Sequence, residues 1–190
     1  MSLSTDRSTP APDWNPLQLL NDGTSPKDTE PTEEATAYVV FKLSGQWLAV
    51  DVRQVREILD KQPITPVPNA PHDVQGIIDI RGRDVLIVDL AQHLGTVGLG
   101  EDDAARIVVF EFQRPGATPL PVGVLTEAVR DVVRLADDAI IDPPEALSRW
   151  DQSLLLGVTR LDGRPLVVLN LFSLFEARPD LVVDDAFDFA

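Results

Sequence analysis

The 190-residue chain contains no cysteine, only three lysines, and a charge that is strongly of one sign. Without cysteine it has no disulfide, no thiolate nucleophile and no Cys-ligated metal site, and this absence fits either redox compartment. Its 16 Lys and Arg residues stand against 31 Asp and Glu residues, a formal net charge of −15. Binding to nucleic acid or to an anionic membrane relies on a basic face, so both classes of partner are disfavoured.

Long apolar runs are also missing. The first residues, MSLSTDRSTPAP, lack the apolar core of a signal peptide, and no run approaches the roughly 20 apolar residues of a membrane span. We therefore expect a cytoplasmic protein that does not insert into the membrane.

The charge and the prolines are concentrated at the two ends of the chain. Residues 1–36 carry seven acids, two bases and many Pro, Ser and Thr residues, a composition typical of disorder. Residues 177–190 form a second acidic tail, with four acids and one base. A single folded domain is expected over residues 37–176, in two lobes.

The first tail contains an apolar segment with helix-start and helix-stop signals. Asn15 is a predicted N-cap, and Gly23 is the stop. We expect a short helix over residues 14–22, in which Trp14, Leu17 and Leu20 dock on a partner or on the folded core. A helix of this length is marginal alone in water.

Short β-branched runs, separated every eight to twelve residues by Gly, Pro or Asp, indicate an all-β domain. Ser44-Gly45 and Asp162-Gly163 are predicted hairpin turns, the second of type I′. Two short helices are expected, at 90–94 and 171–175. The predicted strands are 38–43, 46–52, 55–60, 76–81, 83–89, 106–112, 120–126, 129–135, 154–161 and 164–169.

The sequence repeats itself. GIIDIRGRDVLIVDLAQHL, which starts at Gly76, aligns without gaps with GVTRLDGRPLVVLNLFSLF, which starts at Gly157, at a constant offset of 81 residues. Earlier segments also match, YVVFKL with RIVVFEF and VREIL with VRDVV. The chain is therefore predicted to contain two copies of one β unit, each closed as a small barrel without exposed edges.

The residue types that enzymes use do not form a recognisable set. The serines of the core lie in no nucleophile elbow, and His72 and His93 are interpreted as isolated surface imidazoles without metal-site spacing. No cofactor or metal is therefore expected. Asp79 and Asp89 remain as an acid–base pair for a small acidic β-barrel enzyme, although Asp is common at strand ends and turns for structural reasons.

Several segments resemble, in order, the CheW family of chemotaxis coupling proteins. FKLSGQWLAVDVRQVREIL resembles the opening hairpin and the following strand of the family, and ITPVPNAPHDVQGIIDIRG resembles its Pro- and Gly-containing centre. Gly123, the run IDPP and Gly157 continue the match, which spans about 138 residues. This resemblance implies two intertwined five-stranded SH3-like barrels, with short helices and disordered tails.

The resemblance also implies a function without catalysis. Such an adaptor binds the CheW-like regulatory domain of the histidine kinase CheA and the cytoplasmic tip of methyl-accepting chemoreceptors, and it assembles them into membrane-associated arrays. The same fold serves equally in a chemosensory pathway that does not control swimming. The sequence does not choose between these outputs.

The partner-binding residues that the resemblance implies are Val55, Glu57, Ile58, Arg81 and Gly82. Arg81 is expected at the end of a strand, on one face with Ile77 and Asp79, either reaching a partner carboxylate or pairing internally with Asp79 or Glu57. In a barrel strand Val55 and Ile58 are more often core than interface. Asp79 departs from the family pattern, which has Asn there.

Overall fold

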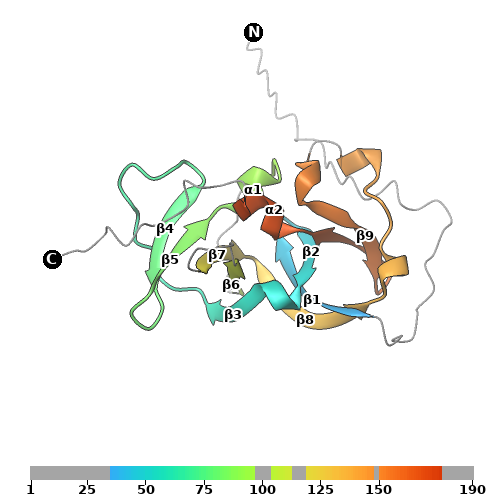
Figure 1. Cartoon of the computed structure of the whole chain (residues 1–190), viewed down its shortest axis with the longest axis horizontal. Helices are drawn as coiled ribbons and strands as arrows, with labels where there is room; N and C mark the ends of the chain where they lie inside the picture. The colour runs from blue at the N-terminus through green and yellow to red at the C-terminus, as the bar shows by residue number, and fades with distance from the viewer. Residues whose placement is uncertain (1–34, 97–103, 113–118, 148–149, 177–190) are drawn as a thin grey trace, which may run out of the picture.

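The computed structural model describes residues 35–96, 104–112, 119–147 and 150–176 (Figure 1). The predicted helix at 14–22, with Trp14, Leu17 and Leu20, lies outside the described residues, as does the acidic tail at 177–190. The first strand begins at Thr36, the last residue of the segment that we assigned to the first tail.

All ten predicted strands and the two helices predicted within residues 37–176 are present, so the all-β class is confirmed. Short 3-10 turns η2 (Val52–Gln54), η3 (Asp137–Ala139), η4 (Glu145–Leu147) and η5 (Gln152–Leu154) join some of them. The helices are α1 (Leu90–His93) and α2 (Leu171–Glu176). The strands are β1 (Thr36–Leu43), β2 (Gln46–Asp51), β3 (Val55–Asp60), β4 (Val74–Asp79), β5 (Asp84–Val88), β6 (Arg106–Phe112), β7 (Leu120–Thr126), β8 (Ala128–Leu135), β9 (Leu155–Leu161) and β10 (Arg164–Leu169).

The strands form two five-stranded sheets that exchange segments, as expected. Lobe A has the order β8-β1-β2-β10-β9, and lobe B has the order β3-β6-β7-β5-β4. The chain crosses from lobe A to lobe B after β2 and returns after β7. Neither half of the sequence therefore contains a complete sheet, and the two lobes lie side by side in Figure 1.

The internal repeat of the sequence corresponds to a repeat in the structure, both in strand order and in backbone hydrogen bonds. The two sheets have the same strand order when β1–β5 are matched to β6–β10. The amide of Asp89 donates to the carbonyl of Asp73 at 2.8 Å, and at the offset of 81 residues the amide of Asn170 donates to the carbonyl of Leu154, also at 2.8 Å. The two copies therefore serve as internal controls for each other.

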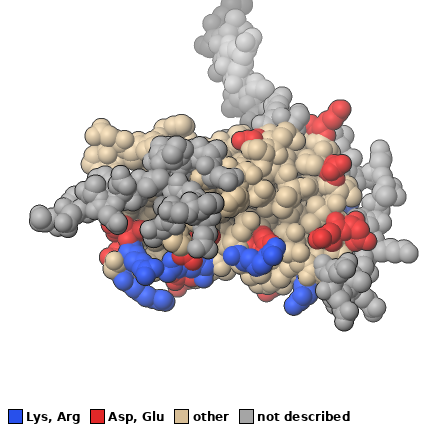
Figure 2. All heavy atoms as spheres, viewed as in Figure 1, with Lys and Arg blue, Asp and Glu red and all other residues tan. Residues whose placement is uncertain are grey.

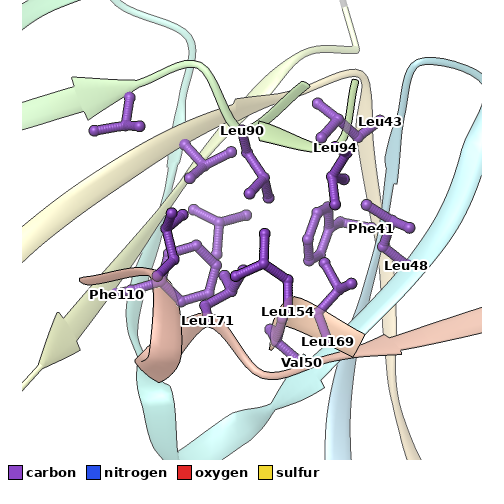
Figure 3. Packing of buried hydrophobic residues seen from close by; sticks show 14 of the residues in the cluster. Phe41, Leu43, Leu48, Val50, Leu90, Leu94, Phe110, Leu154, Leu169 and Leu171 are labelled. Carbon is purple, nitrogen blue, oxygen red and sulfur yellow. The ribbon is translucent and has the colours of Figure 1, made fainter. Parts of the chain in front are cut away.

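Alternation along the strands divides the core into three parts. In β1, Phe41 faces a shared core between the lobes while Val40 faces the interior of lobe A. In β6, Phe110 faces the same shared core while Val109 faces the interior of lobe B. Figure 3 shows side chains from both lobes and both helices meeting in the shared core. Because side chains alternate with period two, each central strand contributes to two cores.

Candidate partner-binding surface

Strand β3 lies at one edge of lobe B and supplies three of the five expected binding residues. Its burial alternates, with Val55 and Glu57 half-buried and Ile58 exposed. Val55 packs against the shared core, as expected for a barrel strand. Ile58 instead exposes 43% of its surface, so it does not follow the general tendency of such strand residues to lie in the core and is accessible to a partner. A β-bulge lies between Val55 and Glu57, and the alternation that turns Ile58 outward continues through it.

Arg81 does not lie on a strand face, which corrects the sequence-based expectation. Strand β4 ends at Asp79, and Arg81 and Gly82 are the central residues of the β4–β5 turn, with φ of 57° and 78°. Positive φ at both positions is what a type I′ hairpin turn requires. The amide of Gly82 donates to the Asp79 carboxylate at 2.8 Å, which closes the turn. The Arg81 side chain is consequently 87% exposed.

The fold brings the hairpin tip to β3. The Arg81 guanidinium lies 3.9 Å from the Glu57 carboxylate, a long ion pair between the β4–β5 turn and β3, whose strands lie at opposite ends of the strand order of lobe B. Arg56 lies between two acids, at 3.9 Å from Glu57 and 2.7 Å from Glu111. Of the five expected residues, Glu57, Arg81 and Gly82 therefore come together, whereas Ile58 points to the opposite, exposed side of β3.

Charged side chains of both signs gather around this tip, a feature that the sequence reasoning missed. Within the described part of the chain, exposed Lys61 and Arg83 form no ion pair. In Figure 2 blue and red atoms lie next to one another at the lower left, where Figure 1 places β3 and the β4–β5 hairpin. The Arg-Gly-Arg pattern at residues 81–83 is the part of the sequence from which exposed charges at this turn could have been predicted.

The Asp51 carboxylate stabilises the segment that connects lobe A to lobe B, between β2 and β3. The Asp51 carboxylate accepts the Arg53 amide at 2.9 Å and caps η2, and it also accepts the Arg53 Nε at 3.0 Å. These hydrogen bonds from Arg53 hold the pKa of the Asp51 carboxyl below its ordinary value, against the opposing effect of burial. The start of β3 is thus fixed by a charged cap.

The two carboxylates considered for catalysis have structural partners. Asp79 caps the hairpin turn, and Asp89 accepts the Gln92 amide at 3.3 Å at the start of α1. Among the described residues, no three His, Asp or Glu side chains are grouped so that they could hold a metal ion. The described segments also include no helix that is long and apolar enough to span a membrane.

His93 is not an isolated surface imidazole, and that interpretation is wrong. Its Nε2 atom lies 2.8 Å from the carboxylate of Asp73, which is only 2% exposed. The tertiary fold packs α1 beside the start of β4 and so joins residues 20 positions apart. Sequence spacing gave no signal for this pair. His72 is exposed, as expected.

Comparison with known proteins agrees with this architecture. A CheW-like domain model matches residues 37–178. Chemotaxis protein CheW of Rhizobium meliloti (strain 1021) is 32% identical over 137 residues, which cover 72% of this chain and 85% of that protein. Chemotaxis protein CheW of Thermotoga maritima is 29% identical over 136 residues, with the same two coverages.

A solved structure shows the same fold. The scaffolding protein TtCheW from Thermoanaerobacter tengcongensis has a TM-score of 0.65 and 24% identity, and the match covers 80% of this chain and 94% of that one. The two intertwined sheets, the matched residues and these relatives lead to one conclusion: this chain belongs to the family of CheW-like domain proteins.

Proposed function

We propose that this chain is a non-catalytic adaptor that couples chemoreceptors to the histidine kinase CheA in cytoplasmic signalling arrays. Family membership supports the adaptor role, because the relatives are chemotaxis proteins and the solved neighbour is a scaffolding protein. The observation that carries the proposal is the exposed hairpin tip, where Arg81 and Gly82 lie beside Glu57 of β3, the strand that also exposes Ile58. The partners are the receptor tip and the CheW-like domain of the kinase.

The chemistry of this surface suits recognition of another protein. Ile58 offers an exposed apolar contact on a strand that also carries charged side chains of both signs, and Val55 of the same strand packs against the shared core. Apolar contact of this kind supplies affinity, while the surrounding charges select the partner and its orientation. Such an adaptor shifts the kinase between two states only if it binds them unequally.

Charge reversal at the tip tests the proposal. Arg81→Glu is expected to weaken binding to a receptor-tip fragment or to the kinase regulatory domain by about tenfold or more, since a like-charge contact costs more than about 1.4 kcal/mol. The folded state remains, because the side chain is 87% exposed. Titration calorimetry measures the binding affinity, and circular dichroism measures whether the variant remains folded.

Two matched variants separate a partner role from an internal one. Glu57→Arg combined with Arg81→Glu restores the internal pair with reversed polarity, so binding recovers only if the pair is purely structural.

Arg164→Glu makes the same charge change as Arg83→Glu at the repeat-equivalent position of lobe A. Unchanged binding by both Arg81→Glu and Arg83→Glu would contradict a partner site at this tip.

A further inference from the structure

Four charged side chains of lobe B form a row that runs from β6 across β3 to the β4–β5 turn. In order along the row they are Glu111, Arg56, Glu57 and Arg81, so acids and bases alternate. The Arg56 guanidinium donates a hydrogen bond to the Glu111 carboxylate at 2.7 Å. The two oxygens of Glu57 face different cations, Oε1 towards Arg56 and Oε2 towards Arg81, each at 3.9 Å. Because this distance is too long for a hydrogen bond, Glu57 is divided between two arginines and held closely by neither.

The strands anchor three members of the row and leave the fourth exposed. Arg56 occupies the bulge of β3, so no residue of β6 lies directly opposite it, and its side chain reaches Glu111 on β6. The side chains of Arg56 and Glu57 are 31% and 21% exposed, whereas that of Arg81 is 87% exposed. Arg81 is therefore the end of the row that another protein can reach.

The repeat-equivalent row of lobe A has its charges in a different order. Its members, from the strand to the turn, are Lys42, Arg130, Asp131 and Asp162. A lysine repels an arginine, and Arg130 instead lies 2.7 Å from Asp162 of the turn. The turn charge of lobe A is thus taken up closely within the chain. In lobe B the acid at position 111 holds the equivalent arginine away from the turn, and the turn charge is engaged only loosely.

Other charges around the tip are of both signs, and several have partners of their own. The Asp79 carboxylate accepts the Gly82 amide at 2.8 Å, and Asp60 pairs with Arg106 at 3.2 Å. Among the residues that the structure describes, Glu57 is the one acid within ion-pair distance of Arg81. The availability of the Arg81 guanidinium therefore depends on how strongly Glu57 is attracted elsewhere.

Arg56 supplies that attraction. A carboxylate between two cations is drawn towards both, and removal of one leaves it to the other. Without Arg56, Glu57 is expected to close on Arg81 as a hydrogen-bonded pair of about 2.8 Å. A guanidinium that an internal acid engages in this way has fewer donors to offer to the carboxylate of a partner.

We propose that Arg56 is a positioning residue for the candidate partner surface: held by Glu111, it draws Glu57 away from Arg81 and so keeps the Arg81 guanidinium available to a partner carboxylate. The partner step rests on the proposed function, whereas the effect on Arg81 within the chain does not.

NMR of the Arg81 Nε–Hε group tests the intrachain effect without any partner. Its order parameter is expected to be low in the wild-type chain and to rise in Arg56→Gln, because Glu57 then immobilises the guanidinium. The order parameter should fall again in Arg56→Gln/Glu57→Gln, in which the capturing acid is gone. Arg56→Lys keeps a cation near Glu57 and should leave Arg81 as mobile as in wild type.

Arg130→Gln is the matched control, because it removes the repeat-equivalent arginine of lobe A and should leave the Arg81 signal unchanged. An Arg81 signal that does not respond to Arg56→Gln overturns the proposal. A rise that persists in Arg56→Gln/Glu57→Gln also overturns it, since Glu57 is then not the group that captures Arg81.

The partner step is measured by calorimetry with the CheW-like regulatory domain of the kinase and with a receptor-tip fragment. Arg56→Gln is expected to weaken the binding of at least one of them by about two- to fivefold, the range that an exposed ion pair allows. Arg56→Lys should bind as wild type does. An unchanged urea midpoint in Arg56→Gln shows that the loss of affinity does not come from a damaged fold.

The two measurements separate the two proposals. If Arg81 becomes ordered in Arg56→Gln and both affinities stay unchanged, the positioning effect stands and the partner role of Arg81 is wrong. If Arg81→Glu weakens binding while Arg56→Gln leaves the Arg81 signal unchanged, the proposed function stands and the positioning role of Arg56 is wrong.

Discussion

Gly76 and Gly157 mark two close approaches between backbone segments. A Cβ on Gly76 would lie 2.3 Å from the carbonyl oxygen of Thr65, and one on Gly157 would lie 2.5 Å from that of Ile141. Both carbonyls belong to short bridges that cover the outer edges of β4 and β9. The two copies therefore use glycine at the same place for the same reason: backbone must pass where a side chain would collide.

This predicts different costs for two glycine substitutions. Gly76→Ala should destabilise the protein by about 3 kcal/mol, because the colliding atom is backbone and does not move freely. Gly82→Ala has open space around it and only a positive φ of 78°, so the cost should be about 1 kcal/mol. Urea denaturation measures both, and equal costs would contradict the steric argument.

Asp51 predicts a component of acid sensitivity. Its pKa is lowered in the folded state, chiefly by the hydrogen bond from Arg53, so the unfolded chain binds more protons in the window below the ordinary pKa. Its contribution is complete above a pH of about 4 and is lost as the pH falls through the lowered pKa. Asp51→Asn should therefore be less stable than wild type at neutral pH, and this difference should shrink at pH 3. Urea midpoints at the two pH values test this, and a constant difference would argue against it.

At the scale of elements, the two repeat-equivalent strand–helix units, β4 with α1 and β9 with α2, pack through different kinds of side chain. Asp73 and His93 join β4 to α1 through a hydrogen bond, while the repeat-equivalent Leu154 and Leu174 join β9 to α2 through apolar contact. The backbone hydrogen bonds at both places match, so the difference lies in the side chains. A buried polar pair is often no more stabilising than apolar residues of similar volume.

A double-mutant cycle that copies the leucines of the second repeat tests this comparison. His93→Leu alone should destabilise by about 1–3 kcal/mol, since the buried Asp73 carboxylate loses its 2.8 Å partner. Asp73→Leu/His93→Leu should recover most of this loss and approach or exceed wild type, because the second copy already packs leucines there. A double variant as unstable as the sum of the single ones would show that the pair is not replaceable.

At the scale of the whole molecule, the exchanged strands and the shared core couple the two lobes. Phe41 and Phe110 come from different lobes and lie in the same core cluster, with side chains of both helices. Each sheet combines strands from both halves of the chain. Unfolding of one lobe therefore removes part of the other, which favours a single cooperative transition.

Hydrogen exchange measures this coupling. Phe110→Ala should lower the opening free energy of β7 in lobe B and of β10 in lobe A by the same amount, about 3–5 kcal/mol. Ile58→Ala, on the exposed side of β3, should change both by about 0.5 kcal/mol or less. A loss confined to lobe B would mean that the lobes unfold independently.

The sequence by itself determined the elements and their repetition. The alternation in β6 and the turn signal Asp162-Gly163 depend on neighbours along the chain, so they were predictable, as were the two copies at an offset of 81 residues. The order of the segments that resemble one family also identified the architecture.

Only the tertiary structure decided which of these residues meet. Arg81 was expected on a strand face, and the two-residue turn moved it to an exposed tip beside Glu57, 24 positions earlier in the chain. Ile58 faces outward because Val55 and Leu59 take the inner side of β3 against the cores, and His93 contacts Asp73 because α1 packs beside the start of β4. Contacts between distant positions depend on how the two lobes exchange strands. The pattern of neighbouring residues along the chain does not show which distant strands pair, so these contacts could not be predicted from it.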